Sequence, residues 1–204
     1  YNRLILLEPA LQAVPPSGRL SLVQLALPAL RAMDVESFVQ FRQALRWLME
    51  TDRQIDLFEY ALQRMTERVL TQHFAPAPPR AIRYSSLRGL EEPMRVVLSA
   101  LAWVGHGDPV EARQSYARGW AGLGWTGPAL GLLDPAQCGL AKVDKALAQL
   151  AEASPAVKRQ ILNACVETVT ADGWLRESEA ELLRAIADAL DCPVPPLLSG
   201  VDQD

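Results

Sequence analysis

Apolar residues recur at intervals of three and four along most of this chain, and no stretch alternates between apolar and polar positions as a half-buried strand does. The spacing predicts helices at 20–33, 35–51, 56–72, 90–104, 109–119, from 135 onwards, 155–170 and 176–190. Short connections between helices favour antiparallel neighbours. We therefore expect an all-α bundle of about eight or nine helices, with Pro28 kinking or interrupting the first of them.

Capping residues stand where the pattern places the helix starts. Asp34, Asp108 and Ser154 each offer a side-chain oxygen to the free N–H groups of a first turn. Pro109 and Pro155 follow two of these residues at the helical position that tolerates proline. These caps support the predicted boundaries independently of the apolar spacing.

The stretch 154–198 organises the rest of the chain. It predicts one helix, a tight acidic loop at 171–175 and a second helix. Gly173 can adopt the left-handed conformation that ends a helix, and Pro193 stops the second helix shortly after Leu190. The segment is therefore a helix–loop–helix unit with an acidic turn.

A shift of 120 residues aligns an earlier part of the chain with this unit. It pairs Asp52 with Asp172, Glu59 with Glu179, Leu62 with Leu182 and Leu70 with Leu190. We interpret the two segments as degenerate repeats, and we expect the helix pairs 35–72 and 155–190 to superimpose and to share a core with the central helices. Arg53 stands where the second copy has Gly173, so we expect the two loops to follow different backbone paths.

The segment 164–183 reads Ala-Cys, six residues, then Asp-Gly-x-Leu-x-x-x-Glu-x-x-Leu-Leu, and this pattern resembles the helical modules of the tellurite-resistance TerB family. The tail 187–197 and the segment 48–62 are similar to the C-terminal region of bacterial membrane-anchored zinc metallopeptidases of the HExxH type. The resemblance implies two TerB-like repeats in a soluble region on the cytoplasmic side of the bacterial inner membrane. The zinc site and the membrane helices would then precede Tyr1.

The resemblance further implies a non-catalytic interaction or regulatory domain. Its partner would be another protein or the peptidase's own catalytic domain, and the zinc would belong to that catalytic part, so we expect no cofactor in this chain. We expect an opening segment and first TerB-like repeat at 1–74, then a Pro-rich spacer, central helices and a Gly-rich loop at 75–153, and the second repeat and tail at 154–204. We expect these parts to form one compact unit.

Composition narrows the function further. Half of the 204 residues are hydrophobic, the formal net charge is −4, and the basic residues are scattered, which argues against a nucleic-acid partner. No apolar run approaches the ~20 residues that a membrane-spanning helix needs. The three cysteines lie far apart and are odd in number, which suits a reducing compartment better than a disulfide framework.

No motif for catalysis is present. His73 and His106 are 33 residues apart and neither is followed by Glu, so they do not form the HExxH motif. We expect both histidines to have structural roles. Cys165 lies on the apolar face of its helix and is expected to be a buried, unreactive thiol. We therefore expect the chain not to be an enzyme, with an independent enzyme as the less favoured alternative.

The acidic loops are the candidate metal sites. Carboxylates of Asp172 and Glu179, and of Asp52 and Glu59 in the first copy, could bind Ca²⁺ or Mg²⁺, which would make the chain a divalent-cation-responsive module. The favoured interpretation is structural, because acidic residues at the start of a helix cap it and complement its dipole. Glu179 and Glu59 stand near the third position of their helices, from which a carboxylate reaches back to the free N–H groups.

Trp174 follows the glycine of the second acidic loop. We expect its indole to close over the core between the two helices, the alternative being an exposed contact residue. Between 119 and 133, five glycines and two tryptophans predict an irregular loop.

Overall fold

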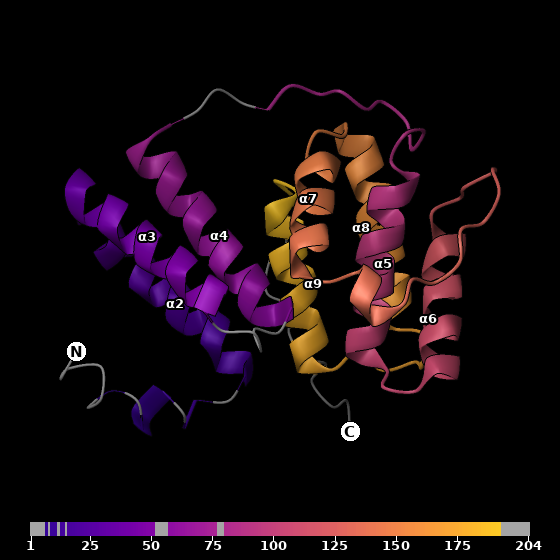
Figure 1. Cartoon of the computed structure of the whole chain (residues 1–204), viewed down its shortest axis with the longest axis horizontal. Coiled ribbons are helices and arrows are strands. Elements are labelled where there is room, and N and C mark those ends of the chain that lie inside the picture. The colour runs from indigo at the N-terminus through magenta and orange to yellow at the C-terminus, as the bar shows by residue number, and fades with distance from the viewer. Residues whose placement is uncertain are drawn as a thin grey trace, which may run out of the picture.

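The computed structural model describes residues 7, 9–11, 13–14, 16–51, 57–76 and 80–192. Its architecture is all-α, with 69% helix and no strand among the described residues, which confirms the predicted fold class. The helices, shown in Figure 1, are α2 (Pro16–Arg31), α3 (Val35–Thr51), α4 (Leu57–Phe74), α5 (Glu91–Gly105), α6 (Pro109–Gly122), the 3-10 helix η1 (Pro135–Gln137), α7 (Leu140–Leu150), α8 (Pro155–Val169) and α9 (Glu177–Ala189).

The helices α5 to α9 surround one hydrophobic core. α5 packs against α6, α7 and α8, and α6 lies along α8. The core is built of apolar side chains from all five helices, among them Leu98, Leu101, Leu150, Ile161 and Leu182. The central helices and the second helix–loop–helix unit therefore bury their apolar faces together.

The N-terminal helices lie beside this bundle (Figure 1). α4 packs on α9 and also contacts α2 and α3, and its Leu70 is fully buried. On α2 and α3, several large apolar side chains stay exposed, including Leu25, Val35 and Trp47. These helices are thus attached to the bundle mainly through α4.

The described part of the connection from α4 to α5, residues 80–90, runs across the top of the molecule as drawn (Figure 1). Its described end is held by a parallel bridge between Tyr84 and Ala153, in which Ser154 N–H donates to the Tyr84 carbonyl at 2.8 Å. Arg83 N–H donates to the Glu152 carbonyl at 2.8 Å. This bridge fixes the segment beside the start of α8.

Several predicted boundaries differ from the structure. α2 continues through Pro28 without a break. α6 runs to Gly122 rather than ending at 119, because Trp120 lies on its buried side and anchors the last turn. The helix expected from 135 is divided into η1 and α7, since Gln137 closes a local turn onto Asp134 and Gly139 then starts a new helix.

The two proposed repeats correspond to α3–α4 and α8–α9. Leu70 and Leu190 are both fully buried, as the alignment requires, whereas Ala44 is exposed and its counterpart Ala164 is buried. The side chain of Leu62 lies outside the described residues. Superposition of the two pairs therefore stays a prediction.

Candidate functional site

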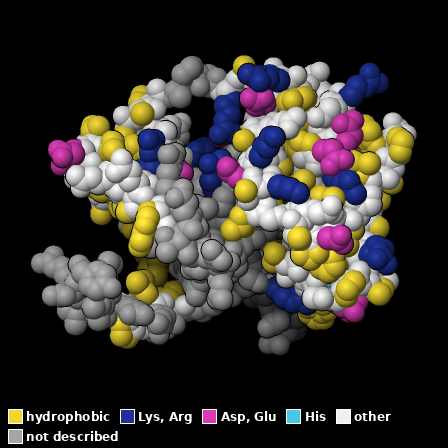
Figure 2. All heavy atoms as spheres, in the orientation of Figure 1, with side chains coloured by type: hydrophobic (Ala, Val, Ile, Leu, Met, Phe, Trp, Pro, Cys, Tyr) yellow, Lys and Arg dark blue, Asp and Glu magenta, His cyan; other side chains and the backbone are white. Residues whose placement is uncertain are grey.

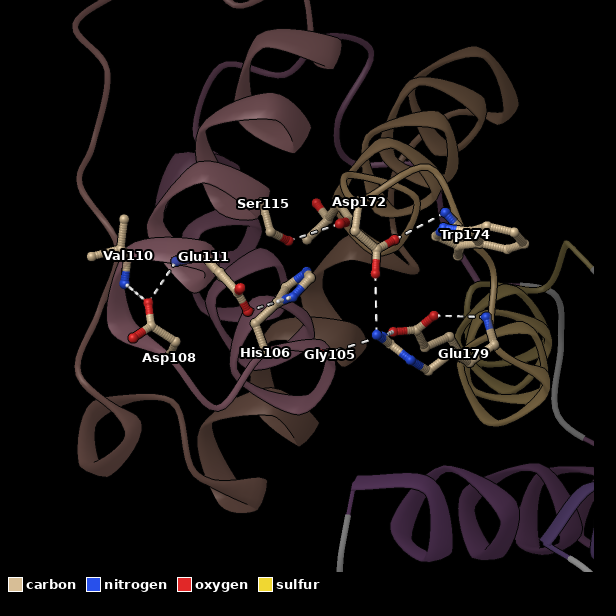
Figure 3. Close-up of polar contacts among 11 residues, drawn as sticks. Gly105, His106, Asp108, Val110, Glu111, Ser115, Asp172, Trp174 and Glu179 are labelled. Atoms are coloured by element: carbon tan, nitrogen blue, oxygen red, sulfur yellow. Dashed lines mark hydrogen bonds and ion pairs between the residues drawn. The ribbon is translucent and has the colours of Figure 1, made fainter.

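The acidic loop between α8 and α9 is closed by hydrogen bonds within itself (Figure 3). Gly173 has φ of +85°, the left-handed conformation expected from the sequence. Asp172 Oδ1 accepts the Trp174 backbone N–H at 3.0 Å, and its Oδ2 lies 3.1 Å from Arg176 Nη2. These contacts lower the pKa of Asp172 below 3.8, chiefly through the Trp174 N–H and secondarily through the charge of Arg176.

Glu179 caps the start of α9. Its carboxylate is only 3% exposed, and Oε2 accepts the Arg176 backbone N–H at 2.9 Å. Oε1 accepts from Arg176 Nη1 at 2.9 Å. The reach-back from the third helical position is confirmed, and Arg176 joins both carboxylates of the loop to each other.

This geometry supports capping over metal binding for Asp172 and Glu179. A divalent ion at either carboxylate would have to displace the Arg176 guanidinium, and the described residues include no group of three His, Cys, Asp or Glu side chains arranged to hold a metal. Asp52 lies outside the described residues, and so does the side chain of Glu59. The metal hypothesis for the first loop therefore stays untested.

The interpretation of Trp174 as a lid is wrong. Its side chain is 76% exposed and points away from the core (Figure 3). The reason is local: the turn at Gly173 and the hydrogen bond from Trp174 N–H to Asp172 direct the backbone so that the indole leaves the loop on the solvent side. The alternative, an exposed residue available for contact, describes its position.

The two histidines lie in separate environments. His73 packs edge-on against Phe74 in the last turn of α4, with ring centroids 4.8 Å apart. His106 follows α5 and is buried, with Nδ1 3.8 Å from a Glu111 carboxylate oxygen and no hydrogen bond at Nε2 from any described residue. They do not form a joint site.

Cys165 is fully buried in the core, as expected. Burial raises the pKa of its thiol to about 12, so the reactive thiolate is not formed near neutral pH. The thiol is therefore part of the packing of α8.

A basic cavity that the sequence did not predict lies where α4 faces the start of α8 and the end of α9. Its volume is about 660 Å³. We call it the cationic groove, and its charged lining residues are Arg42, Arg64, Arg68, Arg80 and Lys158 with Glu67 and Asp191. Figure 2 shows Lys and Arg side chains gathered in the recess between the N-terminal helices and the bundle.

Asp191 is the centre of the ion pairs in this groove. Its Oδ1 lies 3.1 Å from Arg68 Nη1, and its Oδ2 lies 3.6 Å from Arg80 Nη1 and 3.9 Å from Lys158 Nζ. Arg68 also forms two hydrogen bonds with Asp188, one of them from Nε at 3.1 Å. The Asp191 carboxylate is thus shared by Arg68, Arg80 and Lys158, and Arg68 is also paired with Asp188.

The backbone of Asp191 is strained. Its φ is +57°, a region that favours glycine, and the residue ends α9 with the hydrogen bonds of a Schellman motif: Asp191 N–H to the Asp188 carbonyl at 2.9 Å and Cys192 N–H to the Ala187 carbonyl at 2.9 Å. A glycine would adopt this conformation at lower cost. Asp adopts this conformation more readily than most residues other than glycine, and from this position its carboxylate reaches the three cations.

Lys158 reaches the groove from α8 with a mostly buried side chain. It is only 8% exposed, and its single described contact is the 3.9 Å ion pair with Asp191, which is longer than a hydrogen bond. The buried part is the aliphatic stem, while Nζ itself opens on the groove and is accessible to solvent. An acceptor arriving from outside the chain can therefore reach this ammonium group.

Sequence reasoning missed the groove because its cations are dispersed along the chain. Arg42, Arg80 and Lys158 belong to segments that only the packing of α4 on α9 brings together. The single local signal is the i, i+4 spacing of Arg64 and Arg68, which places both on one face of α4. That spacing also occurs on ordinary solvated helix faces.

No known protein family, no curated protein and no solved structure matches this chain.

Proposed function

We propose that this chain is a non-catalytic protein-interaction domain that binds an acidic segment of a partner protein in the cationic groove. The observation that carries the proposal is the charge of the groove: five cations and two carboxylates line it, in a protein whose formal net charge is −4. Asp144 and Asp188, which pair with Arg64 and Arg68, offset part of this charge, and the positive excess that remains is local to the groove. A partner's carboxylates would complement it.

The position of Lys158 supports the same proposal. Its buried stem holds the ammonium group at the groove, where the 3.9 Å contact with Asp191 is its one described ion pair. Arg80 is the more accessible of its neighbours, with a side chain 43% exposed, and stands where an incoming carboxylate would meet it first. Arg80 thus provides an exposed cation of the groove, and Lys158 provides a cation with a mostly buried side chain.

A protein partner fits better than a nucleic acid. The cations occupy one recess rather than a long stripe, and the rest of the chain is acidic. We further propose, from the resemblance to zinc metallopeptidases of the membrane, that the partner is a substrate protein or the catalytic domain of the same peptidase. No helix in the described ranges is long and apolar enough to cross a membrane.

The test is binding of a fluorescently labelled peptide of alternating Glu and Ser, followed by anisotropy at low and physiological salt. We expect Lys158→Gln and Arg80→Gln each to weaken binding about tenfold, because each removes a cation of the groove. Arg159→Gln is the matched control, since Arg159 is the exposed sequence neighbour of Lys158 on α8 and does not line the groove.

Two results would contradict the proposal. If wild-type protein does not bind the peptide at low salt, the groove is not an acidic-segment site. If Arg159→Gln weakens binding as much as Lys158→Gln, the attraction is general electrostatics rather than recognition in the groove. Circular dichroism and a melting curve for each variant establish that it is folded.

A further inference from the structure

The cationic groove contains an anion of its own, Asp191, beside the cations that an acidic segment needs. The Asp191 carboxylate lies at the end of α9 and meets three cations that come from separate parts of the chain: Arg68 from α4, Arg80 from the segment before α5, and Lys158 from α8. Asp191 and an acidic partner therefore require the same positive charges.

Two of these three ion pairs are loose. The distances from Asp191 Oδ2 to Arg80 Nη1, 3.6 Å, and to Lys158 Nζ, 3.9 Å, are longer than a hydrogen bond, and the Asp191 side chain is 37% exposed. Ion pairs that are open to water stabilise a protein only slightly, because the solvent screens them. A ligand carboxylate that hydrogen-bonds directly to Arg80 and Lys158 would therefore replace them at little cost.

The third cation, Arg68, keeps a partner when Asp191 leaves. Its guanidinium donates two hydrogen bonds to Asp188, from Nε at 3.1 Å and from Nη2. The Asp188 side chain is 13% exposed, so this pair is screened less by water and salt than the contact of Arg68 with Asp191. Arg68 would thus remain paired with α9 after the Asp191 contact is lost.

The backbone holds Asp191 at the groove independently of its side chain. The left-handed conformation, with φ of +57°, and the Schellman hydrogen bonds to the carbonyls of Asp188 and Ala187 involve backbone atoms only. Within the described part of the chain, the contacts of the Asp191 carboxylate are all with groove cations. The carboxylate can therefore turn toward solvent while the end of α9 keeps its structure.

We propose, building on the function proposed for the groove, that Asp191 is an internal competitor of the acidic partner. In the unbound protein its carboxylate occupies Arg80 and Lys158, and the carboxylates of an incoming acidic segment displace it. Asp191 thereby lowers the affinity of the groove for anions in general. A ligand binds well only if it gives Arg80 and Lys158 closer contacts than Asp191 does.

The test is the anisotropy titration of the full chain with the labelled Glu–Ser peptide at physiological salt, repeated with Asp191→Asn. Asn adopts the left-handed conformation as readily as Asp, so this variant removes the charge and keeps the backbone. We expect it to bind the peptide about threefold more tightly than the wild type, or better, because Arg80 and Lys158 become free for the ligand. Asp191→Gly should show a similar gain, since glycine also favours this conformation and carries no carboxylate.

Glu167→Gln is the matched control for net charge. It removes one carboxylate at the other end of α8, where Glu167 pairs with Arg118, and salt screens charges at that separation. Its affinity for the peptide should stay within about 1.5-fold of the wild-type value. Asp191→Asn combined with Lys158→Gln should lose most of the gain, because one of the two released cations is then missing.

The outcomes separate this proposal from the function proposed for the groove. If the wild type binds the peptide and both Asp191 variants bind it equally or more weakly, Asp191 positions the cations and does not compete for them; the competitor is then refuted and the acidic-segment site stands. If neither the wild type nor the variants bind, both proposals fail. A gain in Glu167→Gln as large as in Asp191→Asn would reduce the effect to net charge and refute the competitor. Melting curves establish that each variant is folded.

Discussion

Gly119→Ala tests the close packing of α6 on α8, because Gly119 on α6 faces Ala164 and Thr168 on α8. A Cβ at this position would lie 1.8 Å from Thr168 Oγ1 and 2.9 Å from the Ala164 carbonyl oxygen. Thr168 Oγ1 currently donates to that same carbonyl at 2.9 Å. The new methyl group can be accommodated only if Thr168 rotates away from Ala164 or the two helices move apart.

Both routes cost more than the substitution gains. Replacing glycine by alanine inside a helix favours folding by about 1 kcal/mol. Overpacking of a core costs about 1–3 kcal/mol, and a buried hydroxyl that loses its acceptor costs about 1–3 kcal/mol. Because the Cβ would be too close to both Thr168 Oγ1 and the Ala164 carbonyl, the two costs add, and the free energy of unfolding should fall by about 1–5 kcal/mol. The midpoint of about 3 kcal/mol corresponds to a decrease in Tm of about 6–12 °C.

The assay is urea denaturation and thermal melting followed by circular dichroism, with Gly122→Ala as the matched control. A Cβ at Gly122 would lie 3.2 Å from Glu167 Cγ. The Glu167 side chain is flexible and partly exposed, so it can move aside, and the free energy of unfolding of this variant should be within about 0.5 kcal/mol of the wild-type value. Gly119→Ala combined with Thr168→Ala should recover part of the loss, because the hydroxyl is removed. The packing argument is refuted if Gly119→Ala is as stable as the wild type, or if the two glycine variants lose equally.

Trp174→Ala should change Tm by less than about 2 °C, because the indole is 76% exposed; a large loss would mean that it packs on the core after all. Asp172→Ala and Glu179→Ala should each lower Tm by an amount that does not depend on Ca²⁺ or Mg²⁺, whereas a cation-dependent gain in the wild type that both variants abolish would make the loop a cation site. Because the folded-state pKa of Asp172 lies below 3.8, the stability advantage of the wild type over Asp172→Asn should be present above that pH and disappear as the pH falls through the folded-state pKa, as measured by melting curves from pH 6 to 2. Cys165, with its pKa near 12, should remain unlabelled by a thiol reagent at pH 8 in the native state and react after denaturation; labelling without unfolding would contradict its burial.

Local chemistry made much of the fold predictable. The helix Val35–Thr51 begins and ends where its apolar spacing and the cap Asp34 place it, and Asp34 Oδ1 accepts the Ser37 N–H at 2.7 Å. Asp108 and Ser154 also cap the helices assigned to them. Glu179 reaches back to the N–H of Arg176 as its position required. Caps and apolar stripes act within a few residues, so the sequence alone displays them.

In the acidic loop, the sequence predicted the backbone conformation of Gly173 but not the direction of the Trp174 side chain. The left-handed Gly173 was predictable, because few other residues adopt that conformation without strain. The direction of Trp174 was not, since it depends on the exact path of the turn and on which carboxylate accepts its N–H. The role of Arg176 as donor to both Asp172 and Glu179 likewise follows from the packing of the loop against α5.

Most of the helices, their caps and the burial of Cys165 could be predicted from the sequence, because each depends on neighbours in the chain. The places where charge and apolar surface gather follow from how the helices pack together. Arg80, Lys158 and Asp191 meet because α4 and α9 pack side by side, and the loop after α6 returns to be anchored on α5 and α6 by hydrogen bonds from Trp103 and Tyr116. Contacts between residues far apart in sequence depend on how the apolar faces of whole helices pair, and no local pattern encodes that pairing.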